Sequence, residues 1–470
     1  MTPDAPETSS NPIEYNRAYI WTISLIAALG GLLFGYDWVV IGGAKPFYEQ
    51  FFHLTEPSQR GWAMSCALVG CMVGALISGS LSDKYGRKRL LIFSAILFAV
   101  SSVGTGMSHT FAAFVQWRIS GGVAIGFASN LSPMYIAEVA PARDRGKLVS
   151  INQLTIVIGV LLAQLANWLI AKPIPANATA LDILNSWNGQ TGWRWMFGVT
   201  AIPAMVFFTG MLFVPESPRW LAQRGRPERA LEILKRIGGA AYGAQALDGI
   251  ESTLTNGLRK ANFKILFEPA MTKALLIGVV LAVFQQWCGI NVIFYYAQEI
   301  FSAAGYKVSD LLLNILITGA TNLIFTFVAI ALVDRCGRRL LMLIGAAGLA
   351  VTYILLGAGY AAHSHGPHML LLVIAAVAIY SMSLAPVTWV VISEIFPNRI
   401  RGLAMSISVM SLWIASFILT YTFPLLNHGV GSAITFWIYA LICVSGFLFI
   451  KLRLPETKGK TLEEIEKLLS

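Results

Sequence analysis

Nearly charge-free runs recur along this chain, and each is long enough to cross a lipid bilayer as a helix. About 20 consecutive apolar residues span the hydrocarbon core of a membrane. Only 12% of the chain is charged, against roughly 25% in soluble domains. The sequence therefore predicts an all-α membrane protein of about twelve transmembrane helices. Their expected ranges are 19–43, 60–82, 89–107, 112–136, 147–171, 193–214, 272–300, 311–333, 339–361, 368–393, 402–424 and 432–452.

Three charged motifs occur twice, once after each corresponding predicted helix of the two halves. The sequence DKYGRK at 83–88 returns as DRCGRR at 334–339, and Glu-x-x-Pro-x-Arg-x-Arg-Gly occurs at 138–146 and 394–402. PESPR at 215–219 likewise matches PETKG at 455–459. The repetition predicts two homologous bundles of six helices. We expect a polar N-terminus (1–18), an N-terminal bundle (19–218), a helical linker (219–268), a C-terminal bundle (269–454) and a tail (455–470).

Basic residues concentrate in alternate loops between the predicted helices. They lie at 83–89, 143–147, 219–236, 334–339, 399–401 and 451–460. By the positive-inside rule these loops, the linker and both termini are cytoplasmic. This distribution accounts for the net charge of +10 and argues against a nucleic-acid partner. The five Cys show neither a disulfide framework nor metal-ligand spacing, so the sequence predicts no metal and no other cofactor.

The repeated charges admit two interpretations. They are either charged turns that only obey the topology rule, or ion-pair latches between neighbouring helix ends that hold the cytoplasmic side closed and break when it opens. Arginine–carboxylate pairs are directional, and partial exposure keeps their net energy small enough to reverse. The expected latch residues are Asp83, Arg87, Glu138, Arg145, Glu216 and Arg219 in the first half, and Asp334, Arg338, Glu394, Arg401 and Glu456 in the second.

Taken together, these motifs resemble those of the sugar porters of the major facilitator superfamily, over about residues 19–465. Within that family the chain is similar to bacterial proton-linked pentose and hexose symporters and is related to animal glucose facilitators. The resemblance implies two six-helix bundles around a pseudo-two-fold axis along the membrane normal, with substrate between them near the midplane. It implies a non-enzymatic transporter of a monosaccharide and a proton, acting as a monomer in the lipid bilayer of a bacterial inner membrane.

Asp37 is the only carboxylate that the sequence places well inside a predicted span, and an acid there is costly enough to indicate function. Counted from the outer ends of their helices, Asp37 and Arg118 each lie about six residues deep, so we expect them to pair. Separating them would let Asp37 take a proton, whereas a static pair would only fix helix packing. In the family, proton-coupled members carry Asp at this position, so the resemblance implies symport.

Amide side chains in several predicted spans suit sugar hydroxyls, because one amide both donates and accepts. Around Gly289 we expect the seventh span to loosen, as discontinuous transporter helices do. By resemblance, the family's sugar-binding positions are matched by Gln153, Gln285, Gln286, Asn291, Asn322, Trp389 and Trp413. Tyr295 and Tyr296 match residues that help to close the outer side. Ala385, Leu412 and Ser416 depart from the Gly, amide and Asn that members carry, which leaves the sugar open.

The sequence leaves several other functions to weigh. The chain contains no phosphate-cradling Gly-x-x-x-x-Gly-Lys-[Ser/Thr] element and nothing like a nucleophile–base pair. A facilitator without proton coupling is the nearest rival, and Asp37 disfavours it. A transporter-like sensor that binds sugar without turnover is a second. Xylose, glucose, galactose, arabinose and inositol are not ranked by the sequence.

Overall fold

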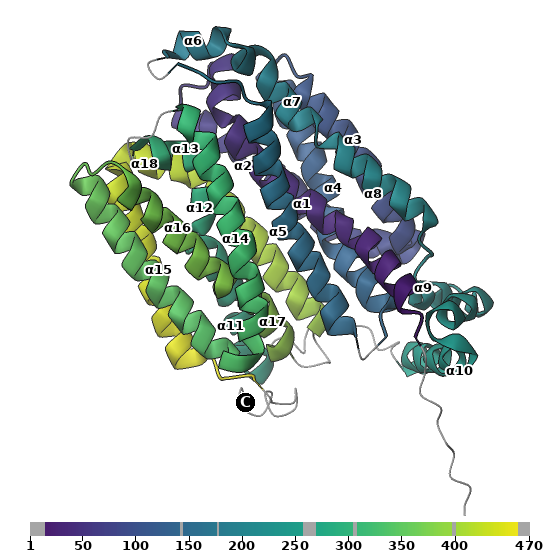
Figure 1. The fold of residues 1–470 in the computed structure, drawn as a ribbon. Helices are drawn as coiled ribbons and strands as arrows, with labels where there is room; N and C mark the ends of the chain where they lie inside the picture. The colour runs from purple at the N-terminus through teal and green to yellow at the C-terminus, as the bar shows by residue number, and fades with distance from the viewer. Residues whose placement is uncertain are drawn as a thin grey trace, which may run out of the picture.

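The structure, a computed structural model, describes residues 15–141, 144–175, 178–256, 269–303, 308–396 and 401–458. Its helices form two bundles, one from each half of the chain, which stand side by side in Figure 1. The predicted polar N-terminus and tail lie largely outside the described residues, as does the end of the linker. The side chains of Asp334 and Arg401 also lie outside them.

The first bundle packs its helices in neighbouring pairs. Within it α2 lies on α4, and α1 lies on α5. A π-helix over Asn188–Gly192 leads into α7 and α8, which together form the sixth span. The elements are α1 (Arg17–Phe51), α2 (Pro57–Tyr85), α3 (Arg87–Gly106), α4 (Phe111–Val139), α5 (Arg145–Ile170), α6 (Ala180–Asn185), α7 (Trp193–Gly198) and α8 (Ala201–Phe213).

The second bundle contains two spans that are interrupted near their middles. As predicted, the seventh span breaks at Gly289, which has φ +86° and separates α11 from α12. The tenth breaks at Ser383, between α16 and α17. The elements are α11 (Pro269–Trp287), α12 (Ile290–Tyr295), α13 (Ala297–Ala303), α14 (Val308–Cys336), α15 (Arg338–Ala361), α16 (Pro367–Met382), α17 (Leu384–Ile395) and α18 (Arg401–Arg453).

Eleven helical segments of the described chain are long and apolar enough to cross a membrane. The last of them, in α18, contains a non-helical residue, Gly431, at φ +80°. A straight helix of 53 residues would be about 80 Å long, far beyond a bilayer, so α18 comprises the two final predicted spans on either side of Gly431. The all-α membrane architecture and its twelve spans are therefore confirmed.

The linker contributes α9 (Pro218–Gln223) and α10 (Pro227–Asn256), so the predicted amphipathic segment at 230–236 is helical. The start of the described chain is bound to α10. There the Asn16 amide donates to the Ile237 carbonyl at 2.8 Å, and the Tyr15 and Tyr242 rings meet edge to face at 5.3 Å. Figure 1 shows α9 and α10 at one end of the molecule. We call this the linker end and the opposite one the far end.

The first helix is longer than its predicted span, which ended at residue 43. α1 continues to Phe51, through Lys45 and Glu49. These two charges are buried, and the Lys45 ammonium lies 2.9 Å from the Glu49 carboxylate one turn on. Because the ion pair lowers the cost of burying both groups, the apolar helix extends past the point where a lysine indicated a loop.

The two halves meet toward the far end. Near it, α2 packs on α18, α5 on α14, and α1 on α12 and α13. The helices approach closely there, since a Cβ placed on Gly42 of α1 would lie 2.7 Å from the Phe294 carbonyl of α12. Trp62 and Phe417 meet edge to face at 6.4 Å, across the halves. The far end is therefore closed by contacts between the bundles.

Candidate functional site

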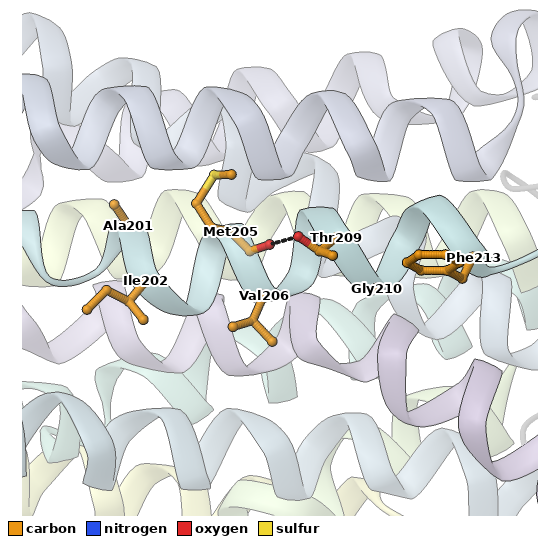
Figure 2. A pocket seen from close by; sticks show the side chains of 7 residues that line it. All are labelled: Ala201, Ile202, Met205, Val206, Thr209, Gly210 and Phe213. Carbon is orange, nitrogen blue, oxygen red and sulfur yellow. Dashed lines mark hydrogen bonds between the residues drawn. The ribbon is translucent and has the colours of Figure 1, made fainter.

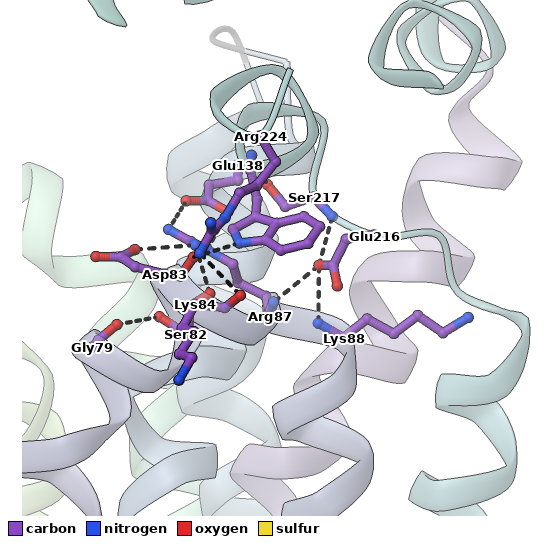
Figure 3. Close-up of polar contacts among 11 residues, drawn as sticks. Gly79, Ser82, Asp83, Lys84, Arg87, Lys88, Glu138, Glu216, Ser217 and Arg224 are labelled. Atoms are coloured by element: carbon purple, nitrogen blue, oxygen red, sulfur yellow. Dashed lines mark hydrogen bonds and ion pairs between the residues drawn. The ribbon is translucent and has the colours of Figure 1, made fainter. Parts of the chain in front are cut away.

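At the linker end of the first half, Arg87 joins three helix ends (Figure 3). Two guanidinium nitrogens lie 3.1 Å from the two carboxylate oxygens of Glu138 on α4. A third contact, at 3.2 Å, reaches Asp83 at the end of α2. One of the two Glu138 contacts is a charge-assisted hydrogen bond, which gives the ion pair a direction as well as a length. These three predicted latch residues therefore come together.

The second half repeats this arrangement. Arg338 donates to Glu394 at 3.2 Å, and the Thr457 hydroxyl donates to the other oxygen of Glu394 at 2.6 Å. Each pair joins helices of one half only, and both are formed while the far end is closed. Whether they open during function stays a prediction, and among the described residues Arg145 and Arg219 have no carboxylate partner.

Glu216 and Glu456 do not take the ion-pair role that the sequence predicted for them, because their principal partners are backbone amides. Glu216 accepts from the amides of Arg87 and Lys88, both at 3.0 Å, at the start of α3. Glu456 accepts from the amides of Arg338 and Arg339, at 3.0 and 3.1 Å, at the start of α15. A carboxylate there satisfies unpaired N–H groups and faces the positive end of the helix dipole.

Glycine makes room for each of these carboxylates. Gly86 has φ +97° and Gly337 has φ +88°, each directly before the helix that the carboxylate caps. A Cβ on Gly86 would collide with Glu216, and one on Gly337 would lie 2.8 Å from Glu456. The repeated glycines of the two motifs thus allow a turn and a close approach.

The two capping carboxylates differ in their acidity. Burial raises the pKa of Glu216 above its usual value, although backbone amides act against it. Burial also acts to raise the pKa of Glu456, but four backbone amides outweigh it and hold that pKa below its usual value. The caps therefore bind corresponding backbone amides and have pKa shifts in opposite directions.

Asp37 and Arg118 form the predicted pair inside the first bundle. One guanidinium nitrogen lies 2.6 Å from an Asp37 carboxylate oxygen, and the residues are only 5% and 4% exposed. The depth count was wrong for Asp37, because α1 extends to Phe51 and places it about 21 Å from that end of the helix. Arg118 lies seven residues after Phe111, about 10 Å along α4. The contact shows that the two side chains nevertheless meet at one level.

Three of the predicted amides form a chain in the second bundle. Gln285 donates to the Ala385 carbonyl at 3.1 Å and accepts from Gln286 at 3.4 Å. Gln286 in turn accepts from Asn291 at 2.5 Å, across the helix break at Gly289. The buried side-chain oxygen of Asn291 has no hydrogen-bond partner among the described residues. This row of hydrogen-bonded amides therefore ends in a free acceptor, to which a sugar hydroxyl could donate.

Asn322, the amide on α14, is held by a residue for which the sequence predicted no role. The Ser381 hydroxyl donates to its side-chain oxygen at 2.7 Å. This leaves the Asn322 amino group to donate elsewhere. Ser381 lies within an apolar span, and a lone serine there gives no sequence signal that separates it from ordinary helix packing.

The ion pair of Asp37 and Arg118 borders a small cavity between the halves. Its lining includes Asp37, Arg118, Trp38, Tyr295 and Trp413. About 20 Å³ is enclosed, roughly enough for one water molecule. The cavity is thus lined both by Asp37, the predicted intramembrane acid, and by Trp413, one of the predicted sugar-binding aromatics. Of the predicted sugar-binding residues, Trp413 alone is in this lining. The sugar-binding role of the other six stays a prediction: Gln153, Gln285, Gln286, Asn291, Asn322 and Trp389.

The two tyrosines expected at the outer gate lie where the halves meet. Tyr295 packs edge to face on Trp38 at 5.8 Å, and Tyr296 lies 5.4 Å from the Lys45 ammonium. The Tyr296 hydroxyl donates to the Thr420 carbonyl at 2.6 Å. Both belong to the segment around the α12–α13 junction, which covers the far end of the cavity.

A second, larger hollow lies on the side of α8 that faces away from the rest of the bundle (Figure 2). Its lining is apolar apart from Thr209, whose hydroxyl donates to the Met205 carbonyl. Ile202 and Phe213 are 63% and 81% exposed. In a membrane protein such a surface faces lipid tails, and it offers a polar ligand no free donor or acceptor.

Comparison with known proteins agrees with the geometry. The family of sugar (and other) transporters matches residues 23–469. The chain is 40% identical to the D-xylose-proton symporter of Escherichia coli K12, over 97% of this chain and 96% of that one. It is 39% identical to the arabinose-proton symporter of Bacillus subtilis 168, over 100% and 98%. Among solved structures, the inward open conformation of the xylose transporter XylE from E. coli covers 96% of this chain and 99% of that one, with a TM-score of 0.83 and 39% identity. The chain belongs to the family of sugar transporters.

Proposed function

We propose that this protein is a proton-coupled monosaccharide symporter, which imports a pentose or hexose by alternating access. The observation that carries the proposal is the buried pair of Asp37 and Arg118, which shares a cavity with Trp413. An intramembrane acid that lines a cavity between two bundles is placed to link protonation to their movement. The relatives named as symporters of xylose and arabinose with protons support this assignment.

The proposed cycle starts with the far end open. Asp37, separated from Arg118, takes a proton there, and the sugar binds to the amides and aromatics between the halves. The bundles then rock, closing the far end and opening the linker end, where sugar and proton leave. The contacts between the halves near the far end correspond to the stage after closure. We assign the linker end, and with it both termini, to the cytoplasm of a bacterium.

Replacing Asp37 by Asn tests the coupling. One pH unit corresponds to about 1.4 kcal/mol, enough for roughly tenfold accumulation of one sugar per proton. We expect wild-type proteoliposomes, acidic outside by one unit, to concentrate labelled sugar by several fold. Asp37→Asn should lose this accumulation and still exchange sugar across the membrane, because the amide cannot carry a proton.

Asp248→Asn, an exposed change of the same kind on α10, is the matched control and should accumulate sugar like the wild type. Gradient-independent uptake by the wild type would identify a facilitator. Sugar binding without any uptake would identify a sensor. Unchanged accumulation by Asp37→Asn would remove this residue from the mechanism.

The same experiment, run with competing sugars, ranks the substrates. We expect xylose, arabinose and hexoses to compete unequally, because Ala385, Ser416 and Leu412 depart from the residues that members of the family carry at these positions. We further propose the predicted domain division, with bundles at 19–218 and 269–454, and function as a monomer without a metal or other cofactor. Size-exclusion chromatography with light scattering checks the monomer.

A further inference from the structure

A stripe of α1 forms the first half's side of the far-end closure. Trp38, Gly42 and Lys45 are spaced four and three residues apart, so they share one face of the helix. Trp38 packs on Phe294 and Tyr295. Gly42 allows the close backbone approach described above. The stripe starts beside Asp37 and ends at Lys45.

Lys45 carries the only charge of this stripe, and it is almost completely buried. The residue is 1% exposed, and its ammonium forms ion pairs with Glu49 on the same helix and with Glu299 on α13. The second pair joins the two halves of the molecule. Glu299 is 25% exposed, so its carboxylate lies at the edge of the interface.

The two partners of Lys45 differ in what happens to them when the far end opens. Glu49 moves with Lys45 because both lie on α1, and Arg60 lies 3.8 Å from its other oxygen. Glu299 belongs to the other bundle and must leave. Opening therefore breaks one ion pair and keeps the other, so the ammonium never lies in the interface without a counter-ion. Such a contact can break and re-form in every cycle.

We propose that Lys45 and Glu299 lock the outer gate: their ion pair forms when the outer side closes and separates each time it opens. The inference rests on the proposed transport cycle. It adds two positioning residues to the predicted gate tyrosines, and it gives Lys45 and Glu49 a role near the outer end of α1.

The test measures the opening of the outer side directly. Spin labels at the exposed outer positions Ser58 and His365, in a background with the exposed Cys336 replaced by Ser, report the distance between the halves. We expect Lys45→Met to raise the open fraction by about tenfold or more, since removing the ammonium leaves the Glu299 carboxylate without its ion-pair partner in the interface. Glu299→Gln, a milder change at a partly exposed site, should shift the distances in the same direction.

Two controls separate the lock from general destabilisation. Lys172→Met removes an outer lysine that lies over Trp187 within the first half, so it should leave the distances unchanged. The exchange Lys45→Glu with Glu299→Lys keeps the same charges and places the new lysine against two carboxylates. It should restore the closed distances. Wild-type distances in Lys45→Met, or failure of the exchange to restore closure, would overturn the proposal.

Transport kinetics give a second readout. The apparent affinity for a ligand rises with the fraction of protein in the binding-competent state. Lys45→Met should therefore lower the KM for external sugar and also lower the maximal rate, because closure has lost its ion pair. A variant that only misfolds would lower the rate at constant KM. Because the distance measurement needs no sugar, it tests the lock even if the proposed substrate class is wrong.

Discussion

Among single residues, the glycines that precede α3 and α15 have the clearest structural requirement. Gly86 combines φ +97° with ψ 160°, a region that only glycine visits without large strain. Its missing side chain also leaves the space occupied by Glu216. A methyl group at this position therefore strains the backbone and displaces the helix cap.

We expect Gly86→Ala to lower the free energy of unfolding by about 2 kcal/mol or more, from backbone strain and a lost cap. Thermal unfolding of the purified protein in detergent measures it. Gly79→Ala is the matched control: a Cβ at Gly79, within α2, meets nothing within 4 Å. That change should be neutral or slightly stabilising, since alanine is the better helix former. Equal losses in both variants would contradict the role assigned to Gly86.

At the scale of helices, the caps of α3 and α15 should respond oppositely to pH. The pKa of Glu456 lies below its usual value in the folded protein, so ionisation stabilises the fold above that usual value, and the effect is lost as pH falls through the folded pKa. The pKa of Glu216 is raised, so the fold gains stability as pH falls through it.

The conservative pair Glu456→Gln and Glu216→Gln checks this difference. At pH 7 we expect Glu456→Gln to cost about 1 kcal/mol, the usual value of a helix cap, and Glu216→Gln to be neutral or stabilising. As the pH falls, the unfolding temperature of the wild type should approach that of each variant. It should reach that of Glu216→Gln at a higher pH than that of Glu456→Gln. Unfolding temperatures between pH 4 and 7 provide the measurement, and the same convergence pH for both variants would refute the assignment.

At the scale of the whole molecule, the sequence predicts what depends on local composition. Apolar runs predicted the spans, and Gly289 predicted the break between α11 and α12. The pairing of Asp37 with Arg118 was predicted from a depth count that was wrong for Asp37, although the pair itself is present. The extension of α1 could not be predicted in the same way, because Lys45 is neutralised in part by Glu299, 254 residues away. The binding of Glu216 to backbone amides could not be predicted either, because every residue except proline has such an amide and no side chain marks the ones that are bound.

Each cap also ties the end of one bundle to that same bundle. Glu216 follows α8 and binds the start of α3, while Glu456 follows α18 and binds the start of α15. Neither of these two carboxylates caps a helix of the other bundle. We therefore expect the two halves to associate even when they are made as separate polypeptides.

A chain divided between Asn256 and Pro269, with both fragments co-expressed, should assemble and take up sugar. We expect an activity within a few fold of the intact protein, because the interface near the far end supplies the remaining recognition. Co-purification through a tag on one fragment, followed by uptake assays, measures this. Fragments divided after Gly198, between α7 and α8, provide the contrast and should fail, since that cut separates the Glu216 cap from the bundle it completes.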